Sequence, residues 1–185
     1  MVYKFLIISD ESDDFLRKIA IDSDATFFDL HNAILDSVGY QKNLLTSFFI
    51  CTDDWEKETE ITLEEMDVSY DRDNWVMRNT KLSDLITDEG QRLIYVFDNM
   101  SERAFFMELK EVETGKSLTT PQCLISKGEP PVQEMDFDEL AAMQSFSENN
   151  DELFYGDEDY NIDELDDEGY DLLDTTNGNP YGDDY

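Results

Sequence analysis

Lysine and arginine are absent from the last third of the chain. All 13 of them lie between Lys4 and Lys127, whereas residues 128–185 hold 20 of the 46 Asp and Glu, within a net charge of −33. A nucleic-acid surface needs clustered Lys and Arg that displace counterions, and an anionic membrane repels a chain of this charge. We therefore expect no direct nucleic-acid or membrane contact, and a basic protein is the partner that the charge permits.

Cysteine and long apolar runs are also scarce. The two cysteines, Cys51 and Cys123, form no C-x-x-C pair, which predicts two free thiols, with a Cys51–Cys123 bridge as the alternative. No stretch is long enough to span a bilayer. The opening MVYKFLIISDESDD has acids where a signal peptide would have its cleavage site. These absences predict a reduced, cytoplasmic protein.

Recognisable catalytic motifs are missing too. The sequence contains no Walker A motif, no G-x-G-x-x-G, no G-x-S-x-G and no H-E-x-x-H. Paired carboxylates are so abundant that they indicate no glycosidase-type pair. The sequence thus favours a protein that is not an enzyme and that uses no cofactor.

The first two thirds of the chain have the hydrophobic patterns of a folded domain. A helix is predicted from Phe27 to Val38, capped by Asp24 or Thr26 and ended by Gly39, and a short second helix is predicted in KLSDLI. Apolar, β-rich runs predict strands at 2–8, 15–21, 44–51, 92–98 and 104–113, with a short strand around 61–63.

This element order predicts an α+β fold. We expect a mixed or antiparallel sheet with one main helix packed on it, β-grasp-like in our first prediction and a split βαβ arrangement as the alternative. The domain should span residues 1–133. Residues 134–148 have the spacing of a docked amphipathic helix, and residues 149–185 form an acidic tail that we expect to be disordered when alone.

Three separate patches resemble the plasmid pRiA4b open-reading-frame-three-like family. The first is FLRKIAIDSDATFFDLHNAILDSVGY followed by SFFI, the second YVFDNMSERAFFMELKEV and the third TPQCLISKGEPP. Together they run from about residue 3 to about residue 133. The matching residues are Arg17, Leu30, His31, Ile34, Gly39, Tyr40, Tyr95, Phe97, Asp98, Pro121, Cys123, Gly128, Pro130 and Pro131.

The chain also departs from that family's pattern. Where the family usually has His-Leu-His-x-Phe, this sequence reads LLTSF, and after Asp98 the usual acid, Trp and His are missing. If the family's polar cluster binds a metal or substrate, most of it is lost here. The resemblance therefore implies a fold and no particular activity.

Three residues are candidates for a binding site. His31 is the one histidine and could act as a base, although its place beside the apolar stripe favours a packing role. Asp98 is either the remnant of a polar site or a turn residue that accepts backbone hydrogen bonds. Cys123 could be a nucleophile or ligand, but a buried inert thiol is favoured.

The acidic tail contains an incomplete calcium-binding pattern and several aromatic residues. DEDYNIDELDDE puts Asp157, Asp159, Asn161 and Glu168 at EF-hand ligand positions, but the sixth position is Ile162 where a glycine is needed, so we expect no specific metal site. The aromatic residues alternate with acids, a pattern typical of segments that dock on a partner. The residues expected to make that contact are Phe154, Tyr155, Tyr160 and Tyr170.

Two functions remain open on these grounds. The first is a binding module whose acidic aromatic tail contacts a basic protein. The alternative is a small-molecule-binding protein or enzyme with a pocket near His31, Asp98 and Cys123. The sequence does not indicate an oligomeric state.

Overall fold

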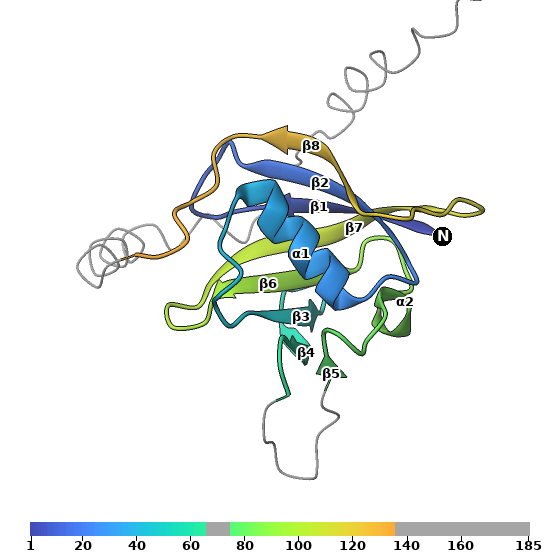
Figure 1. The fold of residues 1–185 in the computed structure, drawn as a ribbon, viewed down its shortest axis with the longest axis horizontal. Helices are drawn as coiled ribbons and strands as arrows, with labels where there is room; N and C mark the ends of the chain where they lie inside the picture. Colours follow the sequence, from blue (N-terminus) through green and yellow to red (C-terminus); the bar gives the residue numbers. More distant parts are fainter. Residues whose placement is uncertain (66–74, 136–185) are drawn as a thin grey trace, which may run out of the picture. The chain divides into compact units, whose positions relative to one another are not determined.

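The computed structural model describes residues 1–65 and 75–135. The chain divides into two units, Met1–Leu140 and Ala141–Tyr185, and every described residue belongs to the first. The elements, in chain order, are β1 (Val2–Ile8), β2 (Leu16–Asp22), α1 (Phe27–Val38), β3 (Ser47–Cys51), β4 (Lys57–Thr62), β5 (Trp75–Val76), α2 (Leu82–Leu85), β6 (Arg92–Asp98), β7 (Arg103–Glu113) and β8 (Gln122–Lys127) (Figure 1).

The chain opens with the hairpin and helix that the sequence predicts. Strands β1 and β2 pair antiparallel in register from Val2–Asp22 to Ile8–Leu16. Helix α1 begins with a capping box, in which Thr26 Oγ1 accepts from the Asp29 amide at 3.2 Å and Asp29 Oδ2 accepts from the Thr26 amide at 2.8 Å. It ends at Gly39, whose φ of 70° suits a residue without Cβ.

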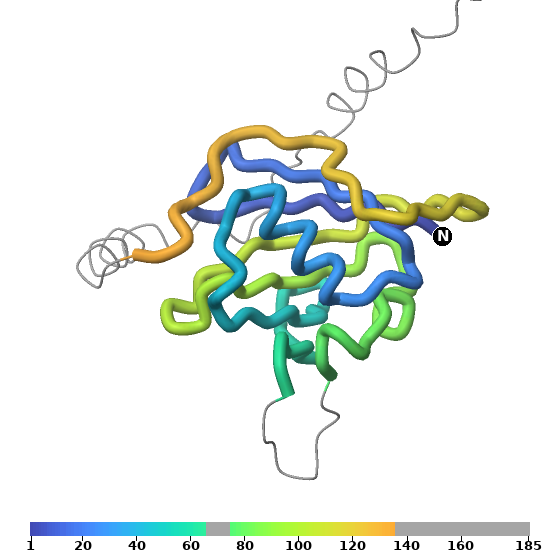
Figure 2. The backbone as a smooth tube through the Cα atoms, viewed as in Figure 1, coloured from blue at the N-terminus to red at the C-terminus, as the bar shows by residue number. Residues whose placement is uncertain are grey.

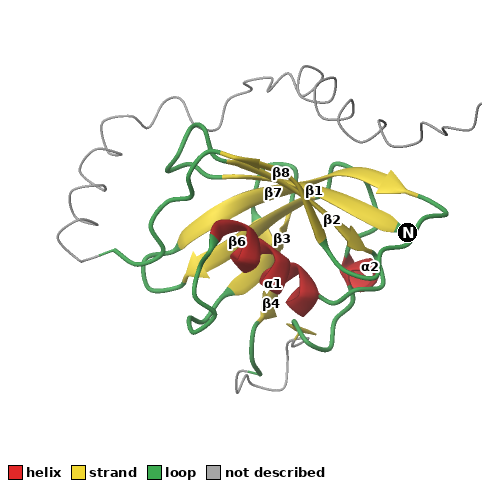
Figure 3. Cartoon of the chain, turned by 45° about the horizontal axis from the view of Figure 1, so that its top comes forward, coloured by secondary structure: helices red, strands yellow, loops and turns green. Residues whose placement is uncertain are grey.

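The eight strands form one sheet in the order β5-β4-β3-β6-β7-β1-β2-β8. Every neighbouring pair is antiparallel except β4–β5. Strands β2 and β3 therefore run in the same direction with β1, β7 and β6 between them, and α1 carries the chain across one face from the first to the second (Figures 1 and 3). The α+β prediction of a mixed sheet with one main helix is confirmed.

Two strands, β5 and β8, were not predicted from the sequence. Strand β5 has only two residues, and β8 lies where no strand was expected. Nearly all of β8 is exposed, so it lacks the apolar alternation by which a strand is recognised. Figure 2 shows this last strand running beside β2 at one edge of the sheet.

The core lies between α1 and the sheet. On the helix, Phe27, Leu30 and Ile34 have no exposed surface. Facing them, the rings of Phe48 and Tyr95 pack with centroids 4.7 Å apart. Burying side chains of this size contributes about 2 kcal/mol each, which holds the helix on this face and leaves its opposite flank toward solvent.

Two arginines hold the segment that runs from the last residue of β8 onward, residues 127–133, which we call the strap. Arg17 Nη1 donates to the carbonyls of Lys127 at 2.5 Å and Gly128 at 3.2 Å. Arg103 forms a bidentate ion pair with Glu11 at 2.7 and 2.9 Å, and also donates to the Val132 carbonyl at 2.6 Å. Because both guanidinium groups are buried, these charge-assisted bonds fix the strap against the domain.

A substitution at Gly128 would measure how closely the strap packs against the domain. Its φ is +67°, and a Cβ built there would lie 2.2 Å from the Asp14 carbonyl oxygen. We expect Gly128→Ala to lower the free energy of unfolding by about 3 kcal/mol, measured by urea denaturation. Gly115→Ala is the matched control, because φ is +78° but no atom lies within 4 Å of its Cβ; it should cost about 1 kcal/mol. Equal losses in the two variants would contradict close packing at Gly128.

Candidate functional site

His31 lies inside the core and belongs to a buried hydrogen-bond network. Its Nδ1 is 2.8 Å from the Tyr95 hydroxyl and 3.2 Å from Thr46 Oγ1, and its ring stacks on Phe28 with centroids 5.7 Å apart. Burial, helped by the charges of Lys42 and Arg78, lowers the pKa of His31 to about 4. At neutral pH the imidazole is therefore uncharged and serves as a hydrogen-bonding group of the core.

Asp98 forms the turn between β6 and β7. Its Oδ1 accepts hydrogen bonds from the amides of Met100 at 3.0 Å and Ser101 at 3.4 Å. This is the local side-chain-to-backbone pattern that favours Asp at the start of a turn. The geometry fits the turn role that the sequence offered as one of its two interpretations.

Cys123 is exposed on the edge strand β8, in contrast to the buried thiol that the sequence favoured. The difference arises because β8 is an edge strand that the sequence analysis did not identify. Its Sγ lies 3.2 Å from the Ile125 carbonyl, to which the thiol donates. Desolvation by its surroundings raises the pKa of this thiol, and the Arg17 charge opposes the shift only in part, so the thiol stays protonated at neutral pH.

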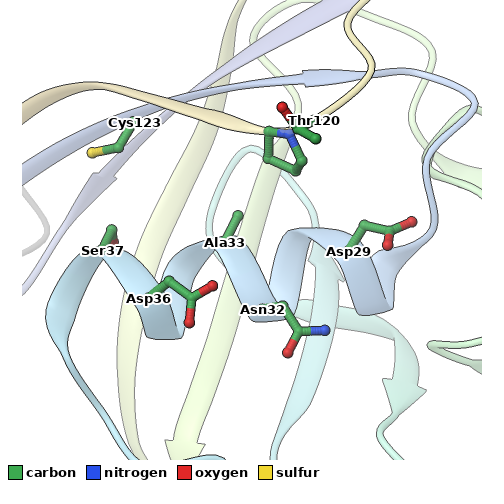
Figure 4. Close-up of a pocket in the computed structure, with 8 residues that line it drawn as sticks. Asp29, Asn32, Ala33, Asp36, Ser37, Thr120 and Cys123 are labelled. Atoms are coloured by element: carbon green, nitrogen blue, oxygen red, sulfur yellow. The ribbon is translucent and has the colours of Figure 1, made fainter.

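Cys123 lines a pocket between α1 and the start of β8, which we call the α1–β8 groove. The groove has a volume of about 430 Å³. The close-up shows the helix side chains on one side and Thr120 and Cys123 on the other (Figure 4). Its lining residues are Asp29, Asn32, Ala33, Asp36, Ser37, Thr120, Pro121 and Cys123.

In the described part of the chain, the three residues that the sequence offered as a binding site do not form one site. His31 bonds to Tyr95 and Thr46, Asp98 bonds within its own turn, and only Cys123 lines the groove. Within residues 1–65 and 75–135, no three His, Cys, Asp or Glu side chains are grouped to hold a metal ion. The tail residues expected to contact a partner, and the incomplete calcium pattern at Asp157–Glu168, lie outside the described residues.

The groove residues on α1 were missed although the sequence carries a signal for them. Positions 29, 32, 33, 36 and 37 follow the i, i+3, i+4, i+7, i+8 spacing of one helical stripe. Three of them are polar or small, and two are Asp. This polar stripe can be recognised only by comparison with the apolar stripe of α1 that faces the core. The residues opposite it in the groove belong to the start of β8, a strand that was not predicted.

The single histidine allows a direct test of the buried network. We expect the His31 ring signals in a proton NMR titration to shift with a midpoint near pH 4, whereas the same histidine in urea should titrate at the ordinary histidine pKa of about 6.5. Since the folded pKa is the lower one, the stability due to neutral His31 is complete above pH 6.5 and is lost as the pH falls toward 4. A folded-state midpoint above pH 6 would contradict the buried, neutral imidazole.

We compared the chain with known protein structures and protein families. The chain is similar to a solved structure, the crystal structure of the protein of unknown function MM3350 from Methanosarcina mazei Go1, with a TM-score of 0.55 and 18% identity. The likeness covers 89% of this chain and 86% of that one, and at this identity it shows the fold alone. Among curated proteins, none matches the sequence.

A family model described as plasmid pRiA4b ORF-3-like protein matches residues 3–172. The match continues well past residue 133, where the three sequence patches end, so it includes much of the acidic region. Because it covers most of the 185 residues, the chain belongs to the plasmid pRiA4b ORF-3-like protein family.

Proposed function

We propose that this protein is a binding module whose acidic, aromatic tail, residues 149–185, contacts a basic protein partner. The observation that carries the proposal is the charge distribution, since residues 128–185 contain 20 acids and no Lys or Arg. Uncompensated charge of one sign attracts a partner of the opposite sign over about a Debye length, close to 8 Å at physiological salt. It also disfavours nucleic acid and anionic membranes as direct partners.

The chemistry of the described residues supports a binding role in preference to catalysis. A neutral His31 enclosed in the core has no access to a substrate, and a protonated Cys123 thiol is a poor nucleophile. Asp98 is engaged in its turn. The small-molecule alternative would need these three groups in one pocket, and they have separate neighbours.

The state of the cysteines supports a cytoplasmic location as part of the proposal. Cys51 and Cys123 are both free, one buried and the other exposed, as expected where thiols stay reduced. Neither helix within the described ranges is long and apolar enough to cross a membrane.

The tail's aromatic side chains give the sharpest test. We expect replacement of Phe154, Tyr155, Tyr160 and Tyr170 by Ser in the full chain to weaken binding of a captured basic partner by about tenfold or more, because each buried ring contributes roughly 2 kcal/mol. Binding by the unchanged chain should also weaken as salt rises from about 50 to about 500 mM. The measurement is quantitative capture followed by a titration with each identified partner.

The matched control is Tyr181→Ser with Tyr185→Ser, which removes aromatic rings from the same tail outside the named set. It should bind like the unchanged chain. If the four-residue variant captured the same partners with the same affinity at every salt concentration, the tail would not be the contact surface and the proposal would be wrong.

A further inference from the structure

Strand β8 is an open edge of the sheet. In the described part of the chain it pairs only with β2, and the sheet order ends with it. An edge strand presents backbone N–H and C=O groups that have no partner in the sheet, and these can pair with a further strand. All residues of β8 except the half-buried Ile125 are exposed, so the strand is accessible to another chain.

The sequence of β8 does little to block such pairing. Proteins commonly protect an edge with proline, with several charges or with a very short strand. Here the six residues Gln122–Lys127 contain no proline and a single charge at the end. The shift in the β2–β8 register at Leu124 is an irregularity of the bulge type, which interrupts the ladder at that residue. An extended segment can therefore pair with β8 on either side of Leu124, whose side chain is 45% exposed.

The α1–β8 groove lies beside this edge and has acidic side chains on its helix flank. Asp29 and Asp36 are both exposed, seven residues apart on α1 and thus on the same side of the helix. Asp36 forms an ion pair with Lys42 that is solvent-exposed and so contributes little. Arg17 also borders the groove, because its Nε donates to the carbonyl of the lining residue Ser37, but its guanidinium group is buried and bonded to the strap. A cationic side chain that entered the groove would meet these carboxylates.

We propose that β8 and the α1–β8 groove together bind an extended, basic segment of a protein partner by strand addition. The segment's backbone pairs with the free edge of β8, and alternate Lys or Arg side chains point toward Asp29 and Asp36, since side chains alternate between the faces of a strand. The inference rests on the proposed function for the basic character of the partner and adds a second contact, on the folded domain.

A second copy of the chain is the less suitable occupant. Each copy carries a net charge of −33, so two copies that joined β8 to β8 would bring like charges together. An anionic partner would meet the same repulsion at Asp29 and Asp36. A basic segment is the occupant that both the edge and the groove accept.

The backbone pairing can be tested with synthetic peptides and the full chain. The probe is a peptide of about ten residues with alternating Lys and Val, together with two derivatives N-methylated on alternate amides in the two possible phases. We expect the parent to slow hydrogen exchange by about tenfold or more at those amides of Gln122–Lys127 that point away from β2. One derivative should do the same and the other should not, because only one set of peptide amides faces β8.

The outcomes separate strand addition from charge attraction alone. Equal effects of the two N-methylated peptides, or no slowing at β8 with the parent, would overturn the proposal. Slowing that appeared without peptide and grew with protein concentration would assign the edge to a second copy and would also overturn it. Asp36→Asn should weaken the effect of the parent peptide, whereas Asp54→Asn, an exposed carboxylate in the β3–β4 connection, should leave it unchanged.

Cys123 supplies an independent readout. It lines the groove and is exposed, whereas Cys51 is buried and serves as an internal control. The parent peptide should slow alkylation of Cys123 and leave Cys51 unaffected; an unchanged Cys123 rate would contradict occupancy of the groove.

The two proposals can fail separately. The variant with Phe154, Tyr155, Tyr160 and Tyr170 replaced by Ser keeps β8 and the groove, so it should show the full exchange protection with the parent peptide. Loss of partner binding in that variant with no protection at β8 in either protein would leave the tail proposal standing and overturn this one. Protection at β8 in both proteins, with partner binding unchanged in the four-residue variant, would overturn the tail proposal and leave this one standing.

Discussion

The packing of one helix against the sheet decides which surfaces the domain presents. The apolar stripe of α1, including Phe27, Leu30 and Ile34, is completely buried, which fixes the rotation of the helix about its axis. The same rotation turns the stripe with Asp29 and Asp36 toward β8 and creates the groove. His31 falls at the border of the buried stripe and is thereby held in a hydrogen-bond network of the core.

The strap after β8 depends on residues distant in sequence. Glu11 and Arg103 are 92 positions apart, and their ion pair has side chains only 10% and 6% exposed. Breaking such a pair would leave an isolated buried charge, which is costly. Tyr40 adds a bond from its hydroxyl to the Pro131 carbonyl. The Gly-x-Pro-Pro ending of the resemblance thus has a structural explanation, since Gly128 passes against the Asp14 carbonyl where a side chain would not fit.

The parts of the fold with strong local patterns were predictable from sequence. The hairpin 2–8 and 15–21, the helix from Phe27 to Val38 and the strand 92–98 all have regular apolar spacing, and the structure agrees closely with their bounds. Strand β8 was missed because an exposed edge strand needs no apolar face. The predicted strand at 44–51 begins only at Ser47, and Leu45, which the sequence placed within it, is 57% exposed.

The candidate site was less predictable, since a site joins elements whose neighbours the sequence does not reveal. The burial of His31 follows from its place beside the apolar stripe, but its bond to Tyr95 spans 64 positions. The groove requires α1 and β8 to face each other, and the second element was not expected. The environment of a side chain could be inferred where it depends on one helix or strand, and could not be inferred where it depends on contact between two.

The low pKa of His31 has a consequence for how the protein's charge responds to its surroundings. Histidine is the side chain that ordinarily titrates between pH 5 and 8, and this chain has one, which stays neutral there. Between pH 5 and 8 the single histidine therefore adds no positive charge to offset the 46 Asp and Glu. An association driven by the negative charge would be weakened by salt and by competing polycations, and not by protonation of His31.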